Sequence, residues 1–496
     1  MEKIHVLALD LGAESGRAIV GGFDGRSIEL HEVHRFPNLS VRLPDGLHWD
    51  ILYLFNEVKK GIRLAYEQYG EGLVSLGIDT WGVDHGLIDA KGHMTFLPYH
   101  YRDSRTDHVM EEVFSIVPKD EIFYQTGIQF MSINTLYQLR SLLQTNPHAI
   151  QNAKTFLTIP DLLNYWLTGK KVSEFSIATT TQCYDPISKD WAFSLLETLG
   201  IPRDIFPEIV PSGTILGNLL PYVTQEIGVH NLQVVAPACH DTASAVLSIP
   251  KSHVPSAYLS SGTWSLLGVE TPRPIINQQS LAMNFTNEGS FDGSIRFLKN
   301  ITGLWIVQEC KRYWQSQGHD YSYSDLTDLA NIAAGHQAYI DTEWPEFLKP
   351  GNMPYKIRQY CALTNQPAPE GHGSVIRCVL ESLALKYKEE FDQLEEVTEQ
   401  HIQQLNIVGG GSQNTLLNQC AANALNRKVV TGPVEATAFG NILGQLIALG
   451  KIETIDRAKD IVSNSCTLNT YQPQNTEEWQ KAYQTYKQLV NDYRNE

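Results

Sequence analysis

The sequence lacks closely spaced cysteines and long apolar runs. Its seven cysteines are odd in number and scattered, with no CxxC pair. This pattern argues against a disulfide framework or a zinc site and predicts reduced thiols. The longest apolar candidate, residues 442–449, contains Gly444 and Gln445 and is too short to cross a membrane. The amino terminus has neither the basic nor the apolar region of a signal peptide. We therefore expect a cytoplasmic protein without a membrane partner.

Positive charge is also scarce. Lysine and arginine total 38 against 55 aspartates and glutamates, which gives a formal net charge of −17. A nucleic-acid-binding protein would show a basic footprint, so nucleic acid is not an expected partner. An anionic small molecule in a local positive pocket remains compatible with this balance. The hydrophobic fraction of 42% is ordinary for a globular protein, and 496 residues are enough for two or more domains.

Several familiar catalytic motifs are missing as well. The chain has no GxSxG and no HExxH, which disfavours hydrolase chemistry of those kinds. The triplet Gly409–Gly411 follows a predicted strand and precedes a predicted helix, but it has neither the GxGxxG nor the GxxxxGK[ST] spacing. A Rossmann or P-loop site is therefore disfavoured. The triplet fits a phosphate turn, an adenosine platform or a tight strand–helix joint.

The opening of the chain is its most informative segment. An apolar run, Ile4–Leu9, ends at Asp10, and a turn containing Gly12 and Gly16 leads through Arg17 into a second apolar run. Short apolar runs bounded by turn residues predict buried strands. A glycine turn can direct backbone N–H groups at an anion, and a carboxylate beside it can meet a hydrated Mg²⁺. The same pattern also fits a plain hairpin with a polar tip.

Strand and helix patterns extend this segment into a larger unit. We expect strands near Ile4–Leu9, Arg17–Phe23 and Ser27–His34, a helix over Trp49–Tyr69 and a strand over Val74–Asp79. Three strands in a meander, then a helix crossing to a fourth strand, is the order of a ribonuclease H-like unit. A further strand is expected over Val83–Asp89, and a helix-rich cap is expected over residues 117–217.

The second half repeats the opening pattern. Residues 257–268 again predict a strand, a small polar turn and a strand, and long helices follow over Ser374–Gln400 and Thr476–Tyr493. A boundary fits residues 249–255, which hold two prolines. The repetition predicts an α/β protein of two related domains that face a cleft.

Three polar groups stand at predicted strand ends. Asp241 opens a predicted helix, so it can be a helix N-cap or a base that accepts a proton from an attacking hydroxyl. His240 beside it is expected to be a structural histidine. The segment Asp79–Asp84 places two carboxylates and Trp81 at a strand end, which fits sugar binding or a polar turn. The segment Tyr101–Arg105 fits a surface ion-pair cluster or a hydroxyl-binding group.

Taken together, these segments resemble the FGGY family of sugar kinases over residues 6–471. Because the phosphate motifs recur in many kinases and ATPases, they are the less specific part of this resemblance. The motifs are Leu9–Arg17 and Tyr258–Ser265 for phosphate; Gly77–Asp84, Tyr101–Thr106, Gly127–Phe130 and Asn134–Leu139 for sugar; His240–Val246 for catalysis; Leu298–Trp305 with Gln308; and Ile407–Asn418, Gly432–Ala436 and Gly440–Asn441 for nucleotide.

The resemblance implies two ribonuclease H-like, actin-like ATPase domains facing a central cleft, with helical insertions. Residues 1–248 would carry the sugar site and the first phosphate motif, and residues 249–496 the second phosphate and adenosine motifs. ATP and Mg²⁺ are the implied cofactors, and Asp10 would anchor Mg²⁺ through water. Asp241 would be the general base. The residues implied to hold the sugar are Gly82, His240, Asp241, Thr242 and Asn300.

The resemblance also implies a nucleotide site. Its residues would be Ala13, Glu14, Ser15, Gly16, Arg17, Thr263, Gln308 and Gly410. Glu14 departs from the family pattern, because many members carry a small neutral residue there. A carboxylate beside phosphate is unfavourable, so we expect Glu14 to point outward.

The sugar-side strings DTWGVD and YRDSRT and the catalytic string HDTASAV are narrower than the phosphate motifs. They resemble the branch of the family that phosphorylates L-rhamnulose to L-rhamnulose 1-phosphate in L-rhamnose catabolism. The expected partners are this sugar and ATP, and the oligomeric state stays open. The alternatives are a kinase of the same fold for fuculose, xylulose or glycerol, and an actin- or chaperone-like ATPase, which would not require the sugar-side strings.

Overall fold

The computed structural model describes residues 3–495, which form two compact units. Unit 1 consists of the residues up to Lys251 together with Glu270–Phe297 and Ala436–Cys466. Unit 2 consists of Ser252–Val269, Leu298–Glu435 and the residues from Thr467 onward. Two late segments of the chain therefore join the amino-terminal part in one compact unit.

Unit 1 is built on a six-stranded sheet. Its strands are β1 (Ile4–Leu11), β2 (Ser15–Phe23), β3 (Ile28–Pro37), β6 (Leu73–Thr80), β13 (Thr214–Asn218) and β14 (Gln233–Ala236). The strand order is β13-β14-β6-β1-β2-β3. β1 pairs antiparallel with β2 and parallel with β6, and β2 pairs antiparallel with β3. This is the predicted meander followed by a parallel strand.

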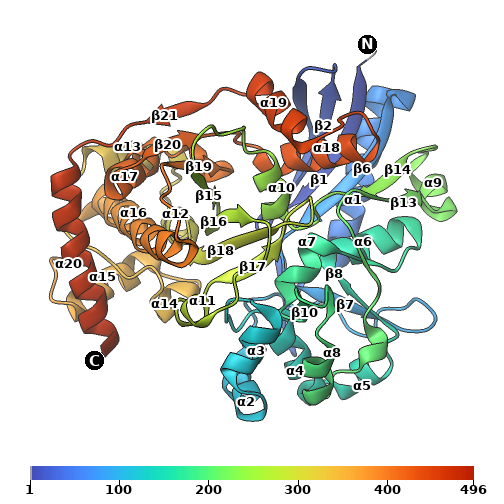
Figure 1. Cartoon of the computed structure of the whole chain (residues 1–496), viewed down its shortest axis with the longest axis horizontal. Coiled ribbons are helices and arrows are strands. Elements are labelled where there is room, and N and C mark those ends of the chain that lie inside the picture. Colours follow the sequence, from blue (N-terminus) through green and yellow to red (C-terminus); the bar gives the residue numbers. More distant parts are fainter. Residues whose placement is uncertain (1–2, 496) are drawn as a thin grey trace. The chain divides into compact units, whose positions relative to one another are not determined.

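Helices cover both faces of this sheet. They include α1 (Ile51–Tyr69), α6 (Ile159–Thr168) and α18 (Ala436–Ala448). Ala18 of β2 lies against Gly61 of α1, where an added Cβ would come within 2.8 Å of the Ala18 Cβ. Gly21 of β2 lies against Ile442 of α18, whose side chain would be 2.7 Å from an added Cβ. Positions 18 and 21 point to opposite faces of a strand, so α1 and α18 lie on opposite sides of the sheet (Figure 1).

A helical region around a second hydrophobic core occupies the segment between β6 and β13. Its buried side chains include Phe123, Tyr137 and Phe156. The helices of this region are α2 (Val109–Ile116), α3 (Lys119–Thr126), α4 (Thr135–Thr145), α5 (Pro147–Gln151), α7 (Phe175–Ala178) and α8 (Phe193–Thr198). It corresponds to the helix-rich cap expected over residues 117–217.

The strand expected over Val83–Asp89 is shorter than predicted and lies outside the main sheet. It is β7 (His85–Ile88), which pairs antiparallel with β8 (Thr155–Thr158) as a separate two-stranded sheet. The other elements of unit 1 are β4 (Ser40–Leu43), β5 (Gly46–Trp49), β9 (Ser173–Glu174), β10 (Tyr184–Asp185), β11 (Asp190–Trp191), β12 (Ile209–Val210), α9 (Pro221–Ile227), α10 (Asp241–Leu247), α11 (Gln278–Ala282), β17 (Thr286–Gly289) and α19 (Ile455–Ser465).

Unit 2 also has a mixed sheet at its centre. Its strands include β15 (Ser256–Ser261), β16 (Trp264–Thr271), β18 (Ile295–Thr302), β19 (Gln404–Val408), β20 (Lys428–Thr431) and β21 (Asn469–Tyr471), in the order β18-β16-β15-β19-β20-β21. β15 pairs antiparallel with β16 and parallel with β19. This arrangement repeats the β1–β2–β6 pattern of unit 1. The unit boundary falls within β16 and within β18 (Ile295–Thr302).

The helices of unit 2 include the two long ones predicted from the sequence. The helix expected over Ser374–Gln400 is α16 (Gly371–Thr398), and the helix expected over Thr476–Tyr493 is α20 (Thr476–Asn495). The remaining helices are α12 (Trp305–Ser316), α13 (Tyr323–Ile332), α14 (Pro345–Leu348), α15 (Met353–Leu363) and α17 (Thr415–Leu425).

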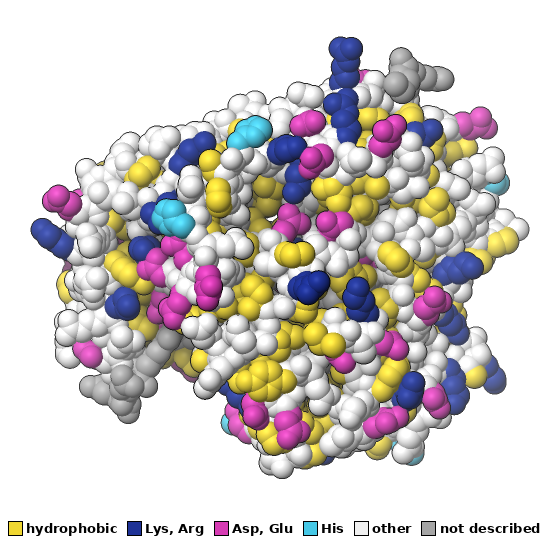
Figure 2. All heavy atoms as spheres, in the orientation of Figure 1, with side chains coloured by type: hydrophobic (Ala, Val, Ile, Leu, Met, Phe, Trp, Pro, Cys, Tyr) yellow, Lys and Arg dark blue, Asp and Glu magenta, His cyan; other side chains and the backbone are white. Residues whose placement is uncertain are grey.

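All seven cysteines carry free thiols. Across residues 3–495, none of the helices combines the length and the apolar character that a membrane span requires. On the face shown in Figure 2, acidic and basic side chains are interspersed with apolar and neutral polar ones.

Candidate active site

Acidic side chains gather where neighbouring strands of unit 1 end. Asp10 of β1 and Asp79 of β6 are paired in register. Thr80 forms a parallel bridge with His240, directly before α10. The carboxyl ends of parallel strands in an open sheet are where ligands bind in α/β proteins. The register thus brings Asp10, Asp79 and the start of α10 to one edge of the sheet.

The charges of these aspartates influence one another. Asp79 is fully buried, and its pKa is raised well above the usual value by burial and then by the neighbouring Asp10 and Asp241 carboxylates. The amide of Asn441 in α18 donates to Asp79 Oδ2 at 2.5 Å. Asp79 Oδ1 is buried and accepts no hydrogen bond from the residues that the structure describes. Three carboxyl groups therefore lie close together at this edge of the sheet, and burial together with their proximity raises the pKa values of Asp79 and Asp241.

A hydrated divalent cation fits such a group of carboxylates. Mg²⁺ binds oxygen ligands, usually through one or two carboxylates, and keeps several of its waters. Asp10 is mostly buried, and its Oδ2 lies 3.9 Å from the Arg17 guanidinium. Among residues 3–495, no three His, Cys, Asp or Glu side chains are grouped so that they could hold a metal directly. The donors present thus fit an ion held largely through water.

The turn between β1 and β2 is held from both sides. Its backbone closes with a hydrogen bond from Gly12 N to Ser15 O at 3.1 Å, and Asn38 Nδ2 donates to Gly12 O at 2.9 Å. A Cβ on Gly16 would lie 2.3 Å from the Phe36 ring, so packing alone requires glycine there. Ala13, Glu14, Ser15 and Arg17 are half-buried.

Glu14 is the member of this turn that departs from the family pattern. Its carbonyl oxygen accepts from Asn38 N at 2.9 Å. The residue is half-buried rather than fully exposed. The expectation that its carboxylate points outward stays a prediction.

Asp241 is the first residue of α10, and the N-cap position belongs to His240. The helix-cap alternative for Asp241 therefore does not match the structure. Thr242 Oγ1 donates to Asp241 Oδ1 at 3.1 Å. Burial and the nearby Asp10 carboxylate raise the pKa of Asp241 to about 7. A carboxylate with a pKa near neutrality is suited to accept and release a proton.

His240 is buried, which favours its neutral form. Its Nδ1 lies 3.0 Å from Arg296 Nη2, and its Nε2 lies 3.4 Å from Asp241 Oδ1. Burial, and then the Arg296 charge, hold the pKa of His240 well below its usual value. Arg296 and Glu288, which is 3.2 Å from Arg296 Nη2, were not found from the sequence. Neither residue stands in a motif, and both are more than forty residues from His240.

The Asp79–Asp84 segment has two different environments. Asp84 is buried, and it accepts hydrogen bonds from Trp49 Nε1 at 2.5 Å and Trp81 Nε1 at 2.9 Å. Gln138 Nε2 donates to it at 2.8 Å. Burial raises the pKa of Asp84 to about 6. The Asp84 side chain therefore links the indoles of Trp49 and Trp81 to Gln138 of α4. Asp79, by contrast, belongs to the group of carboxylates at the sheet edge.

Val83, between these two aspartates, has a strained backbone. Its φ of 66° is in the left-handed region, which a β-branched residue rarely adopts. Thr180 Oγ1 accepts from Val83 N at 3.2 Å, and Thr135 Oγ1 donates to Val83 O at 2.6 Å. A Cβ on Gly82 would lie 3.1 Å from Thr180 Oγ1. Such strain persists where the surroundings impose it and is common at functional sites.

Side chains of the Tyr101–Arg105 segment form hydrogen bonds with other parts of the protein. Asp103 Oδ2 accepts from Leu47 N at 2.7 Å, and Arg105 Nη2 donates to Gln138 Oε1 at 2.7 Å. The Arg105 guanidinium also lies over the Tyr99 ring, 4.3 Å from its centroid. Asp103 is buried, and both side chains form hydrogen bonds with protein groups. The two residues are therefore not part of a surface ion-pair cluster.

In unit 2, the Gly262–Thr263 turn and the glycine triplet Gly409–Gly411 both lie at the end of β15. Gly303 and Leu304 donate through their backbone N–H groups to Thr263 O at 3.1 Å and Gly262 O at 2.9 Å. A Cβ on Gly303 would lie 2.8 Å from Gly262 O. The turn at Gly262–Thr263 is therefore packed against the start of α12.

The glycine triplet lies against the same strand end. A Cβ on Gly411 would lie 2.0 Å from Ser261 Oγ, and Gly409 has a φ of 83°. Gly410 is exposed. Gln308 is in α12, and its buried Oε1 has no hydrogen-bond donor among the described residues. Asn300 is half-buried in β18.

Family models match both halves of the chain. The model described as the FGGY family of carbohydrate kinases, N-terminal domain, matches residues 5–248, and the corresponding C-terminal model matches residues 257–449. A rhamnulokinase from Oceanobacillus iheyensis is 43% identical over 467 residues, which cover 94% of this chain and 97% of that protein. A rhamnulokinase from Bacteroides thetaiotaomicron is 40% identical and covers 98% and 100%.

Solved structures of sugar kinases share the fold. A gluconate kinase from Lactobacillus acidophilus superposes with a TM-score of 0.79 at 14% identity and covers 99% of this chain and 98% of its own. Plasmodium falciparum glycerol kinase with ADP gives a TM-score of 0.78 at 15% identity, with coverage of 99% and 98%. At these identities the likeness concerns the fold alone.

Proposed function

Because the chain belongs to the FGGY family of carbohydrate kinases, we propose that it transfers the γ-phosphoryl group of ATP to the terminal hydroxyl of L-rhamnulose. The products are L-rhamnulose 1-phosphate and ADP. The main support is the similarity to proteins named rhamnulokinases, at 40–43% identity over 94% or more of this chain in three cases. The sugar-side strings DTWGVD and YRDSRT support the same choice of substrate.

Asp241 is the proposed general base. It accepts the proton of the sugar hydroxyl while that oxygen forms a bond to the γ-phosphorus and the bond from phosphorus to ADP breaks. Its place at the sheet edge and its pKa of about 7 support this role. Phosphoryl transfer needs little covalent help from the protein, so most of the catalysis comes from positioning and charge stabilisation.

The proposed sugar residues in unit 1 are Gly82, His240, Asp241 and Thr242. They share a strand-end region with Asp79 and with the strained Val83. Asn300 of unit 2 is proposed to contact the same sugar. The proposed nucleotide residues are Ala13, Glu14, Ser15, Gly16, Arg17, Thr263, Gln308 and Gly410. The packed phosphate turns and the buried acceptor of Gln308 support this assignment.

Asp10 is the proposed anchor for Mg²⁺ through water, and the grouping of the Asp10, Asp79 and Asp241 carboxylates at one sheet edge supports it. When bound with ATP, this cation neutralises charge on the phosphate oxygens. Residues 1–248 and 249–496 are the proposed family domains, which the matches to 5–248 and 257–449 support. The compact units differ from these domains, because Glu270–Phe297 and Ala436–Cys466 belong to unit 1. A cytoplasmic location is also proposed, and the unpaired cysteines support it.

A panel of sugars with ATP, followed by release of ADP, tests the substrate assignment. L-Rhamnulose should give the highest kcat/KM among L-rhamnulose, L-fuculose, xylulose and glycerol. A higher value for another member of the panel would contradict the assignment while leaving a kinase. ATP turnover indifferent to every sugar, together with nucleotide-driven polymerisation, would support an ATPase instead.

A further inference from the structure

Four side chains of unit 1 form a continuous chain that ends at the proposed base. Glu288 of β17 lies 3.2 Å from Arg296 Nη2, Arg296 Nη2 lies 3.0 Å from His240 Nδ1, and His240 Nε2 lies 3.4 Å from Asp241 Oδ1. Glu288, Arg296 and His240 are 4%, 0% and 6% exposed. Only the last member, Asp241, has an appreciably exposed side chain, at 29%.

The arginine determines which nitrogen of His240 carries the proton. A guanidinium can only donate, and it stays charged in proteins. At 3.0 Å from Arg296 Nη2, His240 Nδ1 must therefore be the acceptor. The single proton of the neutral ring then lies on Nε2, which faces Asp241 Oδ1. In the competing arrangement, Nδ1 carries the proton and donates it to Glu288 Oε2 at 3.4 Å. This arrangement is unfavourable, because two donors, Nδ1–H and the Arg296 N–H group, would then face each other.

The backbone at His240 is also fixed by hydrogen bonds. Cys239 N donates to Glu174 Oε2, and His240 N donates to Ser176 Oγ, both at 3.1 Å. These donors fix the peptide that carries the imidazole. The orientation of the ring itself depends on its own partners, Arg296 and Asp241.

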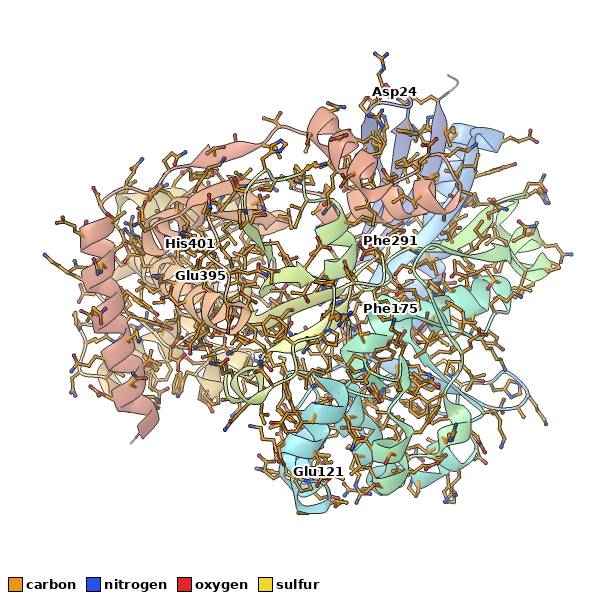
Figure 3. All side chains as sticks on the ribbon, viewed as in Figure 1. Asp24, Glu121, Phe175, Phe291, Glu395 and His401 are labelled. Atoms are coloured by element: carbon orange, nitrogen blue, oxygen red, sulfur yellow. The ribbon has the colours of Figure 1, made fainter. Side chains whose placement is uncertain are left out.

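The strand that carries Glu288 is fixed by close packing. Arg296 Nε donates to Gly289 O at 2.9 Å, and Gly289 N donates to Thr179 Oγ1 at 2.7 Å. A Cβ on Gly289 would lie 2.5 Å from the ring of Phe175, which is labelled in Figure 3. Neither Glu288 nor Arg296 reaches the surface, so neither can touch a substrate in this arrangement.

We propose that Arg296, held by Glu288, is a positioning residue that fixes His240 as the neutral Nε2–H tautomer and so orients the Asp241 carboxylate. His240 Nε2 and Thr242 Oγ1 both face Oδ1 of Asp241. The other oxygen, Oδ2, is therefore the one that accepts the proton from the substrate hydroxyl. The distance of 3.4 Å from Nε2 to Oδ1 fits a bond that shortens once substrate is bound. The link to catalysis rests on the proposed kinase function, while the tautomer does not.

The tautomer can be measured without any substrate. In protein labelled with ¹⁵N-histidine, the ring shifts of His240, identified by their loss in His240→Gln, should show Nε2–H and an unprotonated Nδ1. In Arg296→Met, the ring should change to a mixture of tautomers or to Nδ1–H. Nδ1–H in the wild-type protein, or an unchanged Nε2–H ring in Arg296→Met, would overturn the proposal whatever the substrate is.

Kinetics separate positioning from a merely structural effect. Arg296→Met should lower kcat about 10- to 100-fold, the range seen when a partner that orients a functional histidine is removed from a metal site, with a smaller change in KM. Arg296→Lys should retain more of kcat than Arg296→Met. Arg377→Met is a matched control, because it leaves the buried Glu381 without the Arg377 Nε donor at 2.6 Å in unit 2. An equal loss of kcat in this control would refute the positioning role.

If Arg296→Met fails to fold, Glu288→Gln tests the same chain with less disturbance. It removes the charge that holds Arg296 and keeps an oxygen acceptor. We expect a partial loss of the Nε2–H signal together with a partial loss of kcat. A complete retention of both would contradict the role of Glu288, and the wild-type tautomer would still test the role of Arg296.

Discussion

Asp241 is the side chain on which the proposed chemistry depends most directly. We expect Asp241→Asn to fold and to bind ATP but to lose turnover by about 10²- to 10⁴-fold, the usual contribution of a positioned base. The amide keeps the size of the side chain but cannot accept the hydroxyl proton. ADP release gives kcat, and thermal unfolding with calorimetric ATP titration checks the fold and the nucleotide site.

Asp325→Asn is a suitable comparison for that variant. Asp325 also stands in the first turn of a helix, where its carboxylate accepts from Ser322 N in a capping box. It lies in unit 2 and has no proposed role in catalysis. Its replacement should leave kcat unchanged. Near-normal turnover in Asp241→Asn would remove the catalytic assignment.

Asp84 gives a prediction about stability and pH. Its folded-state pKa of about 6 is above the ordinary value of 3.8. Between these values the folded protein keeps a proton that the unfolded chain has lost, so this group's contribution to stability falls as pH rises. From pH 5 to 7.5, the free energy of unfolding of the wild type should therefore fall by about 1–2 kcal/mol relative to Asp84→Asn.

Urea unfolding of both proteins at the two pH values measures this difference. Asp24→Asn provides the contrast, because backbone N–H donors of Ser27 and Arg26 lower the pKa of this exposed carboxyl. The pH-dependent effect of this substitution should appear only below the ordinary aspartate pKa. The difference in free energy of unfolding between wild type and Asp24→Asn should therefore show no trend from pH 5 to 7.5. A constant difference between wild type and Asp84→Asn would show that Asp84 does not titrate in this window.

The packing of helix α10 against helix α18 positions the proposed base. Gly440 of α18 packs against the backbone of α10 so closely that an added Cβ would lie 1.7 Å from Ser244 O. Since backbone cannot move aside cheaply, Gly440→Ala should destabilise the protein by about 3 kcal/mol or more. It should also lower turnover, because α10 begins with Asp241.

Gly444→Ala in the same helix is the matched control. Its Cβ would meet side-chain atoms instead, at 3.0 Å from Phe291, which Figure 3 labels, and at 3.3 Å from Pro237. These neighbours can shift by small amounts, so the loss in urea unfolding should be smaller. Equal losses for the two variants would contradict the backbone contact between α10 and α18.

The two phosphate turns belong to different compact units. Gly12–Arg17 is in unit 1 and Gly262–Thr263 is in unit 2. If both contact one ATP, nucleotide and sugar should favour the same closed arrangement. We then expect each ligand to tighten the other by the same factor, on the order of 5- to 100-fold.

Titration calorimetry with an inert ATP analogue, in both orders of addition, measures that factor. Small-angle scattering should show a smaller radius of gyration with both ligands than with neither. Sugar affinity indifferent to nucleotide, together with an unchanged radius of gyration, would refute closure. The proposed kinase activity would survive that result.

The sequence was enough to predict those strands and helices that depend on patterns of a few neighbouring residues. The strand–turn–strand opening, the crossover helix α1 and strand β6 follow from short apolar runs and helical spacing, and they place Asp10 and Asp79 at strand ends. Hydrophobic period and turn chemistry act over a few residues, so one sequence is enough to predict them. The family resemblance added the expected roles of these residues.

Which distant segments meet depends on the tertiary fold. Val83 takes a left-handed φ, and β7 leaves the main sheet to pair with β8, because Thr180 and residues 155–158 hold that segment. Arg296 reaches His240, and α18 joins unit 1 from near the end of the chain. Such contacts join residues that are tens to hundreds of positions apart, for which a local pattern carries no signal. The residues that orient the proposed base therefore became visible only in the folded chain.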